Sequence, residues 1–157
     1  MKLYISGMVQ RYHSNPDLAR FGQTNAAHQW GVAALILKLH PNPSRDLIVA
    51  VLLHDVGEID TGDLASPFKR KYPEIADCHS AIEYQHRDET IGQSFPELDD
   101  AEIEWLRICD SLEAFLFAKN HRPDILDRDG WPESVLEIRE TARRLNVYPE
   151  VARLTIF

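Results

Sequence analysis

Residues 52–74 (LLHDVGEIDTGDLASPFKRKYPE) place many charged side chains directly behind an apolar run. The pair His54-Asp55 ends the run, and three carboxylates and a basic cluster follow it: Glu58, Asp60, Asp63 and residues 69–71. Imidazole nitrogens and carboxylate oxygens together bind divalent transition metals, and basic side chains bind anions. A helix with a purely structural role needs no such charge at its buried end, so the segment predicts a chemical site.

Two more polar residues occupy the apolar faces of predicted helices. His28 shares a face with Val32, Leu35 and Leu39, and Asp110 shares one with Ile103, Leu106 and Phe117. A buried carboxylate without a partner costs several kcal/mol, so each must be paired. Either these residues form separate His–Asp hydrogen bonds, or His28, His54, Asp55 and Asp110 converge on one divalent metal ion, which would keep both Asp side chains ionised.

Glu58 lies four residues after His54, one turn farther along if the helix continues. A carboxylate in that position can orient or deprotonate a metal-bound water. The structural alternative, a solvated residue at a helix C-terminus, is disfavoured because an acid there opposes the helix dipole. Asp63, in the sequence Thr61-Gly62-Asp63, is equally well explained as a turn former.

Helical periodicity accounts for most of the chain, and no segment alternates for long enough to predict a sheet. We therefore expect an all-α protein with one domain over residues 1–157 and a loop at 59–72. The expected helices are 24–39 with Thr24 as N-cap, 44–58 with Ser44 as N-cap, 73–93, one opened by Asp99-Asp100, 132–145 and 148–154.

Composition excludes several classes of protein. The formal net charge of −8 argues against stable nucleic-acid binding, which usually needs a basic surface. The apolar runs are too short to span a bilayer, and the N-terminus lacks the pattern of a signal peptide. Two cysteines, Cys78 and Cys109, make no disulfide framework, so we expect a cytoplasmic protein.

The set His28, His54-Asp55 and Asp110 resembles the H…HD…D signature of the HD-domain metal-dependent phosphohydrolases, which are helical bundles. Residues 54–69 (HDVGEIDTGDLASPFK) are similar to the segment HDxxExxTGDxxxPxK of the bacterial 5'-deoxynucleotidases. They are equally similar to that segment of the small phage dATP triphosphohydrolases, whose phages replace adenine with 2-aminoadenine. The pair Arg11-Tyr12 resembles an Arg-aromatic pair that both groups place against the nucleotide, although the aromatic residue is usually Trp there. The resemblance covers roughly residues 8–118.

This resemblance implies a role for each matching residue. The metal ligands would be His28, His54, Asp55 and Asp110, and Glu58 and Asp63 would be the acid/base pair, in an order that the sequence leaves open. Arg11 and Lys69 would bind the phosphate, and Tyr12 and Pro67 would flank the base or sugar. The implied cofactor is one divalent ion (Mn, Fe, Co, Ni or Zn), with room for a second ion carried by the substrate.

The implied reaction is hydrolysis of a deoxynucleotide between the 5'-oxygen and the α-phosphorus. The leading interpretation is a dATP triphosphohydrolase, which forms deoxyadenosine and triphosphate, and the alternative is a 5'-deoxynucleotidase acting on monophosphates. Alarmone hydrolysis is disfavoured because Ile59 follows Glu58, where those enzymes carry a second acid. A two-metal phosphodiesterase would use His79 and His86, and a non-catalytic nucleotide sensor would usually have lost a ligand or the Glu.

The resemblance also bears on partners. It implies a homo-oligomer (a dimer or a hexamer). If a phage encodes the chain, it also implies that the protein is located in the host cytoplasm. The apolar residues Trp105 and Phe115-Leu116-Phe117 could serve an oligomer interface, but core packing is the more usual role.

Overall fold

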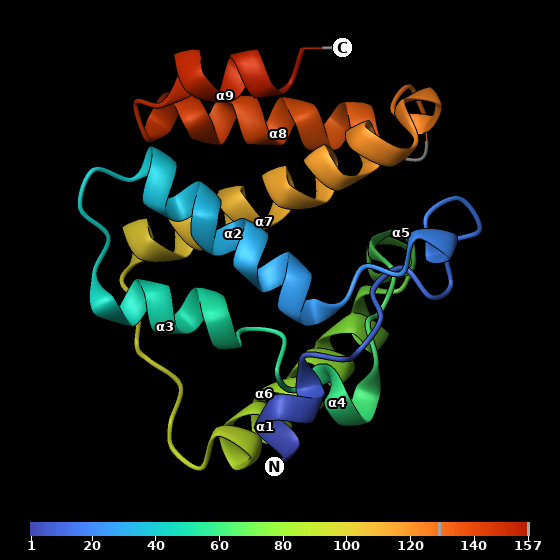
Figure 1. Ribbon diagram of the computed structural model, residues 1–157, viewed down its shortest axis with the longest axis vertical. Helices are drawn as coiled ribbons and strands as arrows, with labels where there is room; N and C mark the ends of the chain where they lie inside the picture. Colours follow the sequence, from blue (N-terminus) through green and yellow to red (C-terminus); the bar gives the residue numbers. More distant parts are fainter. Residues whose placement is uncertain (129, 157) are drawn as a thin grey trace.

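The computed structural model describes residues 1–128 and 130–156, and it confirms the all-α class (Figure 1). Its α-helices are α1 (Lys2–Ser6), α2 (Asn25–Leu39), α3 (Arg45–Leu53), α4 (Glu58–Thr61), α5 (Ser66–Lys71), α6 (Pro73–Ile91), α7 (Asp100–His121), α8 (Trp131–Arg144) and α9 (Tyr148–Leu154). Two 3₁₀ turns lie at Ala19–Phe21 and Pro123–Ile125. Within the described ranges, extended pairing is limited to one bridge between Gln10 and Thr24.

Side-chain caps set three of the helix starts, as the sequence predicts. The Thr24 hydroxyl accepts a hydrogen bond from the backbone N–H of Ala27 at the start of α2. Ser44 caps α3 in the same way, and Asp99 forms a reciprocal capping box at the start of α7. These local hydrogen bonds fix where the helices that carry the site begin.

The prediction of one helix over residues 44–58 is wrong. α3 ends at Leu53, residues 54–57 form a turn, and Glu58 opens the separate short helix α4. The turn brings Gly57 against α6, where a Cβ on Gly57 would lie 2.1 Å from the carbonyl oxygen of Glu83. The predicted loop 59–72 is also largely helical, because it contains all of α5 and all of α4 except its first residue, Glu58.

The core forms where α2, α3, α7 and α8 pack together, with α9 against α8 (Figure 1). α7 lies at the centre, between α2 on one side and α8 on the other. Phe115 is fully buried and Trp105 nearly so, and Leu116 and Phe117 pack against the core. These four apolar residues therefore serve core packing.

A second group of helices, α1, α4, α5 and α6, packs together beside the core. None of the residues of α6, all of which are described, is buried. No helix in the described ranges is both long and apolar enough to cross a membrane.

Candidate active site

Three helices bring the predicted metal ligands together. His28 lies on α2, His54 follows the last residue of α3, and Asp110 lies in the middle of α7. One ligand atom from each of these side chains lies within 4.8 Å of the others. The inward faces that helical periodicity predicted for His28 and Asp110 therefore meet in space.

One ring nitrogen of His28 is held by Glu113, and the other faces the Asp110 carboxylate. Its Nδ1 lies 2.5 Å from Oε2 of Glu113, whose other oxygen accepts a hydrogen bond of 2.7 Å from Gln23. Its Nε2 is buried and makes no hydrogen bond of good geometry, although Asp110 Oδ1 is 3.0 Å away. A carboxylate at Nδ1 is the arrangement that orients a metal-binding histidine.

His54 shows the same arrangement. Its Nδ1 lies 2.8 Å from the carbonyl oxygen of Val51, which can only accept, so Nδ1 carries the proton. Its Nε2 is buried without a hydrogen-bond partner. Asp55 lies beside this group but is not one of the three residues whose ligand atoms all lie within 4.8 Å of one another; its Oδ1 is 3.3 Å from His54 Nε2 and its Oδ2 is 3.7 Å from His28 Nε2.

Buried polar atoms are nearly always hydrogen-bonded, so two unpaired Nε2 atoms facing the same carboxylates need an explanation. A divalent ion supplies one, since neutral imidazole nitrogens and carboxylate oxygens are its usual ligands. His28, His54 and Asp110 therefore fit the predicted metal, and Asp55, whose Oδ2 pairs with Arg11, lies next to them.

The pKa shifts of His28 and Asp110 also indicate a site that favours a cation. Burial lowers the pKa of His28, but the carboxylates of Asp110 and Glu113 outweigh burial and raise this pKa to about 9. Burial raises the pKa of Asp110, and the nearby His28 and His54 more than reverse that effect, so the carboxyl group titrates well below its usual range. The site thus holds a proton on His28 where a metal ion would otherwise balance the charge.

Glu58 lies beside the metal ligands, but not for the predicted reason. It opens α4 instead of continuing α3, so the argument from a C-terminal helix dipole does not apply. The side chain is 5 % exposed, and its Oε2 accepts a hydrogen bond of 2.8 Å from Asn25. Burial, together with the charges of Asp55 and Asp63, raises the pKa of Glu58 to about 8. Glu58 is therefore placed to hold or release a proton next to the metal ligands.

Asp63 ties the N-terminal segment to the site. Its Oδ2 accepts a hydrogen bond of 2.9 Å from the backbone N–H of Tyr12, a residue held at a φ of 58°. The Tyr12 ring stacks on Phe117 at 5.6 Å. Arg11, the preceding residue, donates from Nη1 to Asp55 Oδ2 at 2.8 Å, and its buried Nε has no partner. Arg11 therefore contacts a predicted metal ligand directly and keeps a free donor.

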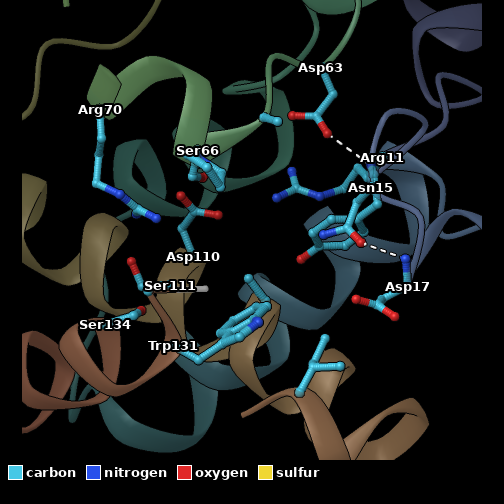
Figure 2. Close-up of a pocket in the computed structure, with 16 residues that line it drawn as sticks. Arg11, Asn15, Asp17, Asp63, Ser66, Arg70, Asp110, Ser111, Trp131 and Ser134 are labelled. Atoms are coloured by element: carbon cyan, nitrogen blue, oxygen red, sulfur yellow. Dashed lines mark hydrogen bonds between the residues drawn. The ribbon is translucent and has the colours of Figure 1, made fainter. Parts of the chain in front are cut away.

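A pocket opens beside Asp110 (Figure 2). Four other predicted site residues line it: Arg11, Tyr12, Asp63 and Pro67. Lys69 does not line it; the Lys69 charge acts instead on Glu83 of α6, lowering a pKa that burial raises. Arg70, its neighbour on α5, lines the pocket in its place.

Three residues that sequence reasoning missed support this site: Asn25, Arg70 and Glu113. Asn25 lies three residues before His28 and Glu113 three residues after Asp110, so each shares a helix face with a metal ligand. That spacing could have found them. Nothing in the sequence separates Arg70 from its basic neighbours.

His79 and His86 lie away from the group of His28, His54 and Asp110. His79 lies 3.2 Å from Glu83 on the same helix, and His86 lies 2.9 Å from Asp60. His86 therefore has a carboxylate partner that accounts for it without a second metal ion, whereas the buried Nδ1 of His79 and Oε1 of Glu83 make no hydrogen bond of good geometry.

Comparison with known proteins agrees with this geometry. The model of the 5'-deoxynucleotidase YfbR-like family matches residues 23–117, more than half of the chain. The chain belongs to this family. No curated protein and no solved structure matches it. Family membership makes the chain a metal-dependent phosphohydrolase of the 5'-deoxynucleotidase type. The match includes the four predicted metal ligands, Glu58 and Asp63, whereas the pocket also uses residues on either side of it, such as Arg11 and Trp131.

Proposed function

We propose that the protein hydrolyses deoxynucleotides between the 5'-oxygen and the α-phosphorus and releases the deoxynucleoside. The observation that carries this proposal is the pair of buried, unpaired Nε2 atoms of His28 and His54 facing Asp110, next to a pocket with basic side chains. A phosphate cannot approach so many carboxylates unless a cation neutralises them.

The metal ion would be held by His28, His54, Asp55 and Asp110. When bound, such an ion lowers the pKa of a water ligand and polarises a phosphoryl oxygen. Arg11, through its free Nε, would neutralise charge on the phosphate oxygens as the ester bond breaks. Its ion pair with Asp55 keeps the guanidinium at the site before the substrate arrives.

Glu58 and Asp63 would share the proton transfers. Each has one carboxylate oxygen engaged, by Asn25 and by the Tyr12 backbone respectively, which fixes the orientation of the other oxygen. The raised pKa of Glu58 suits a group that exchanges a proton near neutral pH. One of the two carboxyl groups would accept a proton from the attacking water, and the other would protonate the leaving 5'-oxygen.

Two substrates follow from this chemistry. Our leading proposal is dATP, with deoxyadenosine and triphosphate as products, and the alternative is a deoxynucleoside monophosphate. Both reactions break the same bond, so the residues named so far serve either one.

A panel of nucleotides tests the proposal. We would incubate the protein with dNTPs, dNMPs and their ribonucleotide counterparts, adding Mn²⁺, Co²⁺, Zn²⁺ or EDTA, and separate the products by chromatography. We expect deoxynucleoside to be released only with metal. Glu58→Gln should abolish the release, whereas Glu74→Gln, on the exposed face of α6, should not change it. If no substrate is turned over while metal is bound, a nucleotide-binding sensor becomes the better interpretation.

We also propose that the chain forms a homo-oligomer through α6. Its apolar residues Ile75 and Ile82, seven positions apart on one face of the helix, are 50 % and 43 % exposed, and exposed apolar patches mark interaction surfaces. Light scattering should find more than one copy for the wild type and a smaller species for Ile82→Asp. Leu136→Asp, which changes an exposed residue of α8, should leave the mass unchanged. A monomeric wild type would contradict the proposal.

A further inference from the structure

The pocket beside Asp110 has two sides of different character (Figure 2). On one side lie Arg11, Asn15 and Asp17, and the Arg11 guanidinium carbon is 5.7 Å from the centroid of the Tyr12 ring. On the other side, Arg70 reaches from α5 toward Asp110, and the hydroxyl groups of Ser66, Ser111 and Ser134 gather with it. An arginine among hydroxyl groups is suited to an anion, because all of these groups can donate hydrogen bonds.

Arg70 differs from Arg11, the other arginine that lines the pocket. Arg11 is committed to Asp55 at 2.8 Å, and its side chain is 12 % exposed. Arg70 is exposed, and it forms no ion pair with any carboxylate in residues 1–128 and 130–156. Its positive charge is therefore available to a ligand, within a chain whose net charge is −8.

Gly130 leaves room for the Arg70 side chain. A Cβ on Gly130 would lie 2.5 Å from Arg70 Nη2, so the guanidinium lies directly against the backbone of this glycine. Gly130 has a φ of +86°, which favours glycine independently of this contact. The arginine thus spans the pocket from α5 to the start of α8.

We propose that Arg70, with Ser66, Ser111 and Ser134, binds the phosphates beyond the one bonded to the sugar. This inference rests on the proposed function. With the α-phosphate near Asp110 and Arg11, a phosphate tail that extends toward Arg70 is neutralised, whereas a monophosphate leaves Arg70 unused. The site therefore prefers a deoxynucleoside triphosphate. Water adds its oxygen to the α-phosphorus, the bond to the 5'-oxygen breaks, that oxygen takes a proton, and triphosphate leaves whole.

The experiment measures binding and turnover separately. Calorimetry on metal-loaded protein carrying Glu58→Ala compares dATP with dAMP, alone and with Arg70→Ala, Arg70→Lys or Lys71→Ala added. Lys71 is the matched control, because it is an exposed neighbour that does not line the pocket. Steady-state kinetics on the same Arg70 and Lys71 variants, with Glu58 intact, give KM and kcat.

We expect dATP to bind more tightly than dAMP, and Arg70→Ala to weaken dATP binding roughly 10- to 100-fold, the value of a hydrogen bond to a charged group. Binding of dAMP should change less than about threefold, as expected for a distant exposed charge. Arg70→Lys should fall between these values, and Lys71→Ala should match its parent. KM for dATP should rise with Arg70→Ala and Arg70→Lys but not with Lys71→Ala, while the melting temperature stays constant.

The outcomes separate this inference from the proposed function. Suppose that the protein turns over substrate, but Arg70→Ala weakens the binding of dATP and dAMP equally or changes neither. This result overturns the role of Arg70 and leaves the hydrolase intact. Absence of turnover with Arg70-dependent binding of dATP overturns the hydrolase and leaves the triphosphate subsite. A protein that binds dAMP as tightly as dATP, or binds neither, overturns the inference.

Discussion

Metal binding should depend steeply on pH, because a proton on His28 occupies the position of the ion. The pKa of His28 in the metal-free protein is about 9, and Nε2 must lose its proton before it can bind a metal. At pH 7, about two pH units below this pKa, removing the proton from His28 costs roughly 2.7 kcal/mol. We therefore expect the apparent metal affinity at pH 7 to be about 100-fold weaker than above pH 9, with roughly a tenfold change per pH unit between them.

Isothermal titration with Co²⁺ or Mn²⁺, in buffers of different ionisation enthalpy, measures both the affinity and the number of protons released. We expect about one proton per ion at pH 7 from His28, more if Glu58 also ionises, and fewer above pH 9. Glu113→Gln is the informative variant, because it removes one of the carboxylates that raise the pKa of His28. It should shift the pH range of proton release downward.

An apparent affinity that stays constant between pH 6.5 and 8.5, with no proton released, would refute this reasoning. His28 would then be neutral before the ion binds, and the charge balance inferred from Asp110 and Glu113 would be wrong. If Glu113→Gln leaves the pH range of proton release unchanged, Glu113 does not control the pKa of His28.

Three further predictions follow from the site. Folding raises the pKa of both His28 and Glu58, so the folded protein holds more protons than the unfolded chain. The melting temperature of the metal-free protein should therefore fall as the pH rises from about 6 to 9. Metal at 100 times its Kd should raise the free energy of unfolding by about 2.7 kcal/mol and so offset this fall. Asn25→Ala removes the hydrogen bond to Glu58, so kcat should fall roughly 10- to 100-fold while metal content, read by atomic absorption, stays at one ion; unchanged kcat would contradict the positioning of Glu58. Gly57→Ala forces a Cβ against the Glu83 carbonyl and should cost about 1–3 kcal/mol, seen as a lower melting temperature in calorimetry; a wild-type melting temperature would count against this close packing.

Local chemistry made much of the fold predictable. The hydroxyl and carboxylate caps at Thr24, Ser44 and Asp99 determine helix starts through hydrogen bonds that span three residues. Helical periodicity alone also places His28 and Asp110 on inward faces, so their convergence could be expected without any coordinates. The first short helix, α1, has no such cap and was not predicted.

The break after Leu53 could not be predicted in the same way. Residues 44–58 carry no proline, and a helix through His54 satisfies local propensity. The chain turns because Gly57 packs against the backbone of α6, a contact between residues 26 positions apart in the sequence. The same long-range packing directs the Lys69 charge to Glu83 and brings Arg70 to the pocket, although both are basic residues of one short helix.

The sequence by itself determined the helical class, and it predicted that His28, His54 and Asp110 converge, because residue type and helical period carry that information. Tertiary structure alone decided which partners these donors have. Glu113 holds the proton on Nδ1 of His28, and Asn25 orients Glu58, because α7 and α4 lie against α2 only in the folded protein. Charge and hydrogen bonding act through distances of a few ångströms, and the chain acquires those distances between remote residues when it packs.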